Sequence, residues 1–126
     1  MSSTPPSPST PGGPGLTDPE DAKLVTLARA TRTRTGATEG ACVRDLDGRT
    51  YAAASVALTS LQVSAVQLAV AMAISSGAQG LEAVVVLGDG ALVAETDLSV
   101  VREFAGGEVP VHLAAPDGTV VASVTS

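Results

Sequence analysis

The order of the elements predicted from the sequence indicates an α/β sandwich with a mixed sheet. Three features carry this prediction. Residues 40–56 have the pattern of a β-hairpin, the run "LEAVVVL" has the continuous apolar character of a strand buried on both faces, and helical patterns flank both. In chain order we expect a helix, a hairpin, a helix, a strand, a helix and two strands, joined by right-handed crossovers.

The first helix is predicted over "DPEDAKLVTLARATR". Asp18 is in position to cap it, Pro19 suits the first helical position, and Glu20 and Asp21 suit the first turn, where carboxylates face the positive end of the helix dipole. The hairpin follows, and its turn contains Asp47-Gly48, a pair that tolerates the backbone angles of a tight turn.

The second helix is predicted over "TSLQVSAVQLAVAMAISSGAQG", from a Ser/Thr cap at its start to a glycine stop at Gly77. No Asp, Glu, Lys, Arg or His occurs from Thr50 to Leu81. At about 100° per residue this helix is apolar on two sides. The first side carries Leu61, Ala65, Leu68 and Met72, and the second carries Val63, Val66, Val70, Ala73 and Ile74. We therefore expect one side to pack on the sheet and the other against a second subunit, although a helix of the same chain could cover the second side equally well.

The remaining elements are a buried strand closed by Gly-Asp-Gly, a short helix in "LSVVREFAGG" that ends at Gly106, and strands in "VPVHLAA" and "TVVASV". The chain has 126 residues, enough for one domain. Residues 1–17 hold five of the eight prolines and no charge, so we expect a disordered tail there and a folded domain over 18–126.

Charge and composition exclude several classes of partner. The net charge of -6 disfavours nucleic acids and anionic membranes. Arg29, Arg32 and Arg34 lie where the first helix ends, and cations at that position complement the helix dipole. The longest apolar run, Leu68 to Ile74, is too short to span a bilayer, and no signal peptide pattern is present. We expect a soluble cytoplasmic protein.

The core must be built from small aliphatic residues, because 44% of the chain is hydrophobic and only 2% is aromatic. Small side chains bury little area each, so stability is expected to depend on oligomerisation. We expect a dimer or a tetramer, together with an unidentified protein partner as a further possibility.

Metal and nucleophile chemistry are restricted by the single cysteine, Cys42, and the single histidine, His112, both in predicted strands. A zinc site needs three or four clustered ligands, so we predict no metal and no cofactor. Composition permits a serine–histidine–aspartate arrangement through His112, but no Gly-x-Ser-x-Gly signature accompanies it.

The element order and the segment "EGACVRDLDGRTYAAASV", which is followed by a buried helix, resemble those of the cytidine deaminase family and its blasticidin-S deaminase relatives. The similarity covers roughly Asp18 to Val121. The matching hairpin residues are Gly40, Ala41, Asp47, Gly48, Tyr51 and Ala52. The resemblance implies a three-layer α-β-α sandwich around a mixed five-stranded sheet.

The family's chemistry uses a zinc-bound water, a glutamate that carries protons and a pair of cysteines. In our alignment Ser64 occupies the position of the first zinc ligand, and Val66 that of the glutamate. Leu98 and Val101 occupy the positions of the two cysteines, while Arg102 still matches. Ser55 and Ala57 replace an Asn-x-Glu that contacts ribose in the family, with a gap of two residues nearby.

These substitutions lead to the functional prediction from sequence. We expect a cytidine-deaminase-like protein without the zinc site, which serves as a non-catalytic homo-oligomeric scaffold or binds a partner. The alternatives are a hydrolytic cytidine deaminase whose ligands are aligned differently, and a small-molecule binding module that uses the residual pocket. The second alternative is weakened because Tyr51 and Phe104 are the only aromatic residues.

Overall fold

The computed structural model describes residue 16 and residues 18–126, and its centre is a mixed five-stranded sheet in the order β2-β1-β5-β6-β7. β5 and β6 run parallel, whereas the other neighbouring pairs, β1–β2, β1–β5 and β6–β7, are antiparallel. The strands are β1 (Gly40–Asp45), β2 (Thr50–Ala54), β5 (Leu81–Leu87), β6 (Pro110–Ala114) and β7 (Val120–Thr125).

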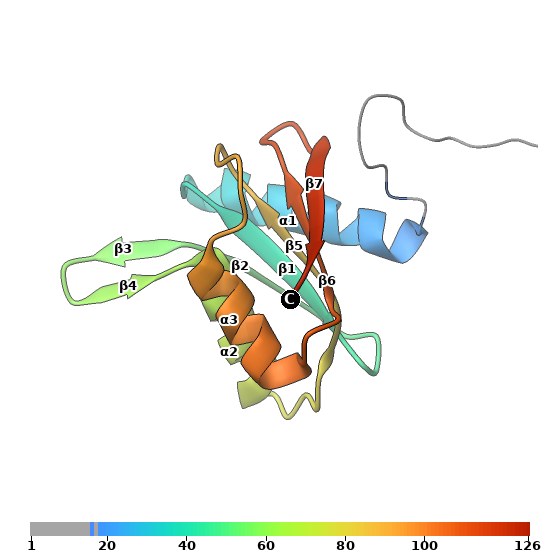
Figure 1. Ribbon diagram of the computed structural model, residues 1–126. Helices are drawn as coiled ribbons and strands as arrows, with labels where there is room; N and C mark the ends of the chain where they lie inside the picture. The colour runs from blue at the N-terminus through green and yellow to red at the C-terminus, as the bar shows by residue number, and fades with distance from the viewer. Residues whose placement is uncertain (1–15, 17) are drawn as a thin grey trace, which may run out of the picture.

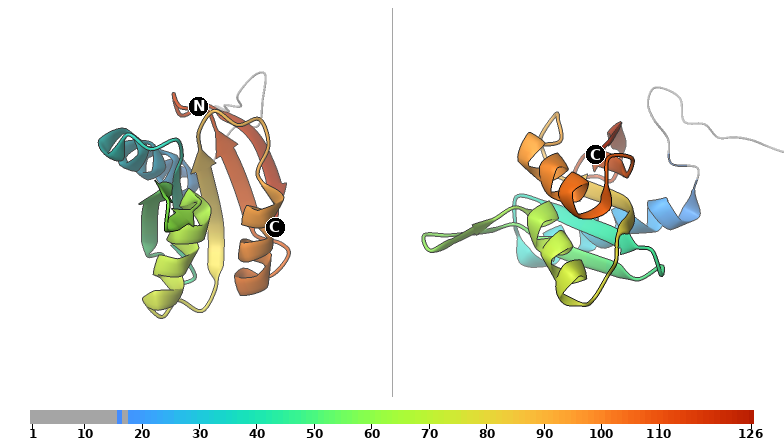
Figure 2. Two further views of the ribbon diagram at one scale, coloured as in Figure 1. Left: turned by 90° about the vertical axis from the view of Figure 1, so that its left-hand side faces the viewer. Right: turned by 60° about the horizontal axis from the view of Figure 1, so that its bottom comes forward.

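Helices cover both faces of this sheet, so the predicted three-layer sandwich is confirmed (Figure 1). α1 (Pro19–Thr35) packs on one face against β1, β2 and β5. α2 (Ala65–Ser75) and α3 (Glu95–Ala105) pack on the other face, as the two further views in Figure 2 make visible. None of the helices among the described residues is long and apolar enough to cross a membrane.

The N-terminal cap of α1 is the one predicted from the sequence, whereas the helix continues to Thr35, past the predicted end at Arg32. Asp18 accepts a 2.8 Å hydrogen bond from the backbone N–H of Glu20, and Pro19 occupies the first turn. At the other end Gly36 adopts a left-handed conformation with φ 71°, and its N–H bonds the Arg32 carbonyl oxygen. Arg32 and Arg34 lie in the last turn, where cations face the negative end of the dipole.

The predicted start of the second helix is wrong by about one and a half turns. Residues 56–63 form a separate hairpin of β3 (Val56–Leu58) and β4 (Leu61–Val63), which projects from the body of the molecule (Figure 1). The helix begins only at Ala65, because Ser64 makes a complete capping box with Gln67. Leu61 and Val63 therefore lie on no helix face.

The core has two parts, one on each side of the sheet. The α1 core contains Leu24, Val25 and Ala28 of α1 against Cys42 and the alternate residues of β5. The α2–α3 core is the larger and is made almost entirely of alanine and valine, with leucine at two positions. Residues 1–15 and 17 of the predicted tail lie outside the described residues, while Leu16 is half-buried and packs on the α1 core.

Only one side of α2 is buried within the chain. Ala65, Val66, Ala69, Val70 and Ala73 face the sheet. On the outer side Met72 is 37% exposed and Ile74 is 50% exposed. Ala65, which the helical-wheel prediction placed with Met72, is fully buried, whereas Met72 on the same stripe two turns later is 37% exposed; Ile74, placed with the buried Val70, is 50% exposed.

Close approach between α1 and β1 depends on the absence of a side chain at Gly40. A Cβ atom built there would collide with the carbonyl oxygen of Ala28 and lie 2.9 Å from Cβ of Arg32. Both obstacles belong to the helix itself and cannot rotate away, so the helix can lie this close to the strand only with glycine at this position.

Gly40→Ala should therefore lower the free energy of unfolding by about 1–3 kcal/mol, the usual effect of overpacking, as measured by urea unfolding. Gly80→Ala is the matched control, since a Cβ there meets only the end of the Leu46 side chain at 3.1 Å. Leu46 is 55% exposed and can turn aside. Equal effects of the two substitutions would contradict this account of helix packing.

Candidate functional site at the helix junction

Ser64 lies at the N-terminal end of α2 and is held there by its own capping interactions. Its hydroxyl oxygen accepts a 3.0 Å hydrogen bond from the backbone N–H of Gln67, and the Gln67 side-chain oxygen accepts one of 3.0 Å from the Ser64 N–H. Two N–H groups at the start of the helix are thereby satisfied. The hydroxyl proton of Ser64 remains available to donate to a neighbouring group.

The Ser64 hydroxyl donates its hydrogen bond to a residue of α3. The Ser64 hydroxyl donates to Oδ1 of Asp97 over 2.6 Å, a short bond of the kind that carboxylate acceptors form. Asp97 lies in the first turn of α3 and is only 3% exposed. The start of α2 and the start of α3 are thus joined by one charge-assisted hydrogen bond across 33 residues of sequence.

Glu39 brings a second carboxylate to this junction from the residue that precedes β1. Its pKa is raised, first because burial disfavours the charged form and second because Asp97 carries a like charge; the backbone N–H of Ala65 acts in the opposite direction. The helix junction, defined as Glu39, Ser64 and Asp97, therefore combines two carboxyl groups and one hydroxyl at the ends of two helices.

The structure brings the four residues of the sequence-based site to one face of the sheet but not into one polar site. Val66 and Val101 are fully buried in the α2–α3 core, and Leu98 is half-buried against it. The residue that bonds Ser64 is Asp97, which immediately precedes Leu98. All three apolar side chains contribute packing and offer no donor or acceptor.

Ser55 and Ala57, the other two altered positions, lie at the end of β2 and on β3. The Ser55 hydroxyl accepts a 3.1 Å hydrogen bond from the backbone N–H of Glu39, and the Ser55 N–H bonds the Glu39 carbonyl oxygen at 3.1 Å. Ala57 is exposed on the projecting hairpin. Ser55 thus positions Glu39 at the junction.

The helix junction does not fit a zinc ion, because it supplies two carboxylates and one serine hydroxyl, whereas a zinc site uses three or four cysteine, histidine or carboxylate ligands. The chain's single cysteine and single histidine both lie on the opposite, α1 side of the sheet. Burial raises the pKa of the Cys42 thiol to about 11, so it is protonated at neutral pH and a poor ligand. The residues the structure describes include no cluster of three or more histidine, cysteine, aspartate or glutamate side chains placed to hold a metal.

Sequence reasoning missed Glu39 and Asp97. An acidic residue in a first helical turn is ordinary, and Asp97 therefore carried no distinguishing signal. The available signal was the charge-free segment from Thr50 to Leu81, since any charge facing that helix has to come from segments that precede or follow it. Glu39 and Asp97 are acidic residues on those two sides.

A shallow depression of about 360 Å³ lies at the opposite end of α2 from Ser64. Its lining consists of Tyr51 from β2 together with Ala71, Met72, Ser75 and Ser76. None of these residues belongs to the helix junction. The depression and the junction are therefore separate features of the same helix.

Comparison with known proteins supports the resemblance noted in the sequence. Residues 17–118 match the family model described as cytidine deaminase-like. No curated protein sequence matches the chain significantly.

Several solved structures share the fold. Cytidine deaminase from Burkholderia pseudomallei superposes with a TM-score of 0.72 at 20% identity, covering 82% of this chain and 90% of that one. The enzyme from Mycobacterium leprae has a TM-score of 0.65 at 19% identity, with 86% and 94% covered. That from Mycobacterium tuberculosis has a TM-score of 0.65 at 23% identity, with 75% and 85% covered.

Ser64→Ala should lower the free energy of unfolding by about 1–3 kcal/mol, because it removes a helix cap and leaves the buried Asp97 carboxylate without its hydroxyl donor. Ser60→Ala is the matched control, an exposed serine where the sequence had predicted the helix to start. It should change stability by less than about 0.5 kcal/mol. Urea unfolding of both variants decides the matter, and a larger effect at Ser60 would refute the junction.

Proposed function

We propose that this chain, which belongs to the cytidine deaminase-like family, is a non-catalytic member that serves as a homo-oligomeric scaffold or binds a protein partner. The observation that carries the proposal is the hydrogen bond between Ser64 and Asp97. It lies where, by our alignment, the family places its first zinc ligand, and it uses the Ser64 hydroxyl for structure.

The lack of a proton-transferring side chain at the position of the family's glutamate supports the same proposal. The position aligned with the family's glutamate is Val66, which is fully buried and cannot exchange protons. Glu39 is a carboxyl group near the junction, but its backbone lies at the start of β1, not on α2. A deaminase needs both an activated water and a group that moves protons to the leaving amine.

The alternative of a hydrolytic cytidine deaminase is suggested by the solved cytidine deaminases that share the fold. Their identities of 19% and 20% to this chain support a common fold and leave activity open. The third possibility, a binding module for a small molecule, would need a pocket at the junction. The depression beside Tyr51 lies elsewhere and is open.

The outer side of α2 supports self-association. Met72 and Ile74 are exposed next to the depression lined by Tyr51 and Ala71. Leu58 and Leu61 on the projecting β3–β4 hairpin are 57% and 50% exposed. Exposed large apolar side chains can mark a surface that packs against another chain, here on the outer part of α2 and, separately, at the tip of the projecting hairpin.

The purified protein should show no turnover of cytidine, deoxycytidine or blasticidin S in an absorbance assay. General acid–base catalysis alone supplies about 100- to 10,000-fold in rate, and the metal contributes further, so losing both leaves no useful activity. The Burkholderia enzyme in the same assay is the positive control. Turnover that a chelator abolishes would establish the deaminase alternative instead.

Charge substitutions on the two sides of α2 test self-association. Met72→Glu, on the outer side, should leave the circular dichroism spectrum unchanged and lower the native mass, because a charge disfavours an apolar interface. Val70→Glu should unfold the chain, since Val70 is 1% exposed and its environment cannot solvate a carboxylate. A monomeric parent, or a Met72→Glu variant of unchanged mass, would refute the oligomer.

A further inference from the structure

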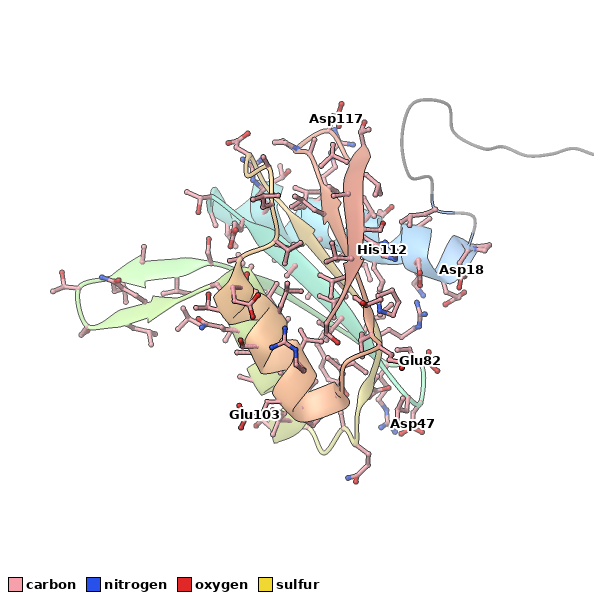
Figure 3. The ribbon with its side chains drawn as sticks, viewed as in Figure 1. Asp18, Asp47, Glu82, Glu103, His112 and Asp117 are labelled. Carbon is pink, nitrogen blue, oxygen red and sulfur yellow. The ribbon has the colours of Figure 1, made fainter. Side chains whose placement is uncertain are left out.

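On the α1 side of the sheet, away from the helix junction, three side chains form a continuous line of hydrogen bonds. Ser123 Oγ lies 2.7 Å from Nδ1 of His112, and Nε2 of His112 lies 3.2 Å from Oδ2 of Asp21. They come from β7, β6 and the first turn of α1. Figure 3 shows His112 beside the N-terminal end of α1.

Strand pairing and burial fix this arrangement. His112 and Ser123 are directly opposite in the antiparallel pair β6–β7, so their side chains share a face of the sheet. His112 is 8% exposed and Asp21 is 9% exposed, whereas Ser123 is exposed to solvent. α1 covers β1, β2 and β5, and the edge strand β7 is outside its main contacts. The serine therefore has both a buried partner and free access to reagents.

The carboxylate of Asp21 determines which nitrogen of His112 carries the proton. A carboxylate only accepts hydrogen bonds, so Nε2–H donates to Asp21. The lone pair of the neutral ring is then on Nδ1, where the hydroxyl of Ser123 donates to it. This is the relation of nucleophile, general base and orienting carboxylate on which serine acyl transfer depends.

Arg44 holds Asp21 in place and is itself bound by Glu82. Arg44 Nη1 lies 2.9 Å from Oδ1 of Asp21, and the two atoms have no other polar partner among the described residues. Nε of Arg44 donates to Oε1 of Glu82 over 2.8 Å. One cation thus faces two carboxylates, and Arg44 fixes the orientation of Asp21 toward His112.

We propose that Ser123 is the nucleophile of a second site, with His112 as its general base and Asp21 as a positioning residue, and that its substrates are accessible esters. Ser123 Oγ attacks the carbonyl carbon of the ester while its proton passes to Nδ1 of His112. The carbon–oxygen bond to the leaving group then breaks, and the leaving alkoxide takes the proton from His112. Water hydrolyses the acyl-serine by the same proton route and restores the hydroxyl.

The site favours unhindered acyl donors, because Ser123 lies on an open strand surface. The side chain of Val121, two residues away on the same edge strand, is 48% exposed and is an apolar group near Ser123 in the chain. This inference does not rest on the proposed scaffold function, since none of its residues lies in the helix junction or on the outer side of α2.

Incubation of the full chain with p-nitrophenyl acetate, followed by peptide mass mapping, tests the proposal. We expect acetylation of Ser123 at least about 100-fold faster than in His112→Gln, the lower range for a general base. Ser99, an exposed serine whose hydroxyl donates to Glu95, is the reference within the same molecule and should stay unmodified. Ser99→Ala should leave the Ser123 rate unchanged.

Acetylation of Ser123 no faster than that of Ser99 in the native chain would overturn the proposal, and this comparison needs no variant to fold. The role of Asp21 has its own readout, because His112 is the single histidine and its ring nitrogens give unambiguous ¹⁵N resonances. The native chain should show the Nε2–H tautomer. Asp21→Asn should shift the tautomer populations of His112. It should also slow acetylation of Ser123 relative to that of Lys23, the single lysine of the chain. Unchanged ¹⁵N resonances would exclude Asp21 as the positioning residue.

Discussion

The hydrogen bond between Ser64 and Asp97 is the interaction on which the α2–α3 side of the molecule depends. It joins the starting points of α2 and α3, with Asp97 almost fully buried and Ser64 half-buried. The other contacts around these two helices are packing contacts between apolar side chains, most of them small. Such contacts do not require a particular orientation of the two helices. A single directional bond at the helix ends therefore sets where the two helices begin relative to each other, and the valine and alanine core follows from that placement.

On the opposite face of the sheet, a different set of interactions fixes the position of the helix. There α1 is joined to the sheet by Asp21, which contacts both Arg44 on β1 and His112 on β6, and by the close approach that Gly40 permits. Charged groups buried in this way require several partners each to offset the loss of water. His112 and Ser123 complete that set at the edge strand, so one polar network both fixes the helix and supplies an exposed hydroxyl with a base.

Much of the fold followed from local sequence chemistry, because its main signals are contained in short segments. Asp18 and Pro19 marked the start of α1, Gly48 marked the hairpin turn, and the apolar run of β5 indicated a central strand. The start of α2 was predicted wrongly, since Thr59 and Ser60 look like a cap and only the reciprocal bonds of Ser64 and Gln67 distinguish the true one. The residues of the two sites were harder to predict from the sequence than the fold. Asp97 meets Ser64, and Asp21 meets His112, across 33 and 91 residues, and no local pattern records such pairs.

We propose that the Ser64 hydroxyl and the Asp97 carboxylate, bonded to each other, close the helix junction without a zinc ion. The most direct measurement is the metal content of the purified full-length chain, determined by inductively coupled plasma mass spectrometry after growth with added zinc and purification without chelators. The account predicts far less than one zinc per chain, because Ser64 and Asp97 satisfy each other and the cysteine and histidine lie across the sheet. One zinc per native chain, and no zinc in a variant that lacks the Ser64 and Asp97 side chains, would contradict this prediction.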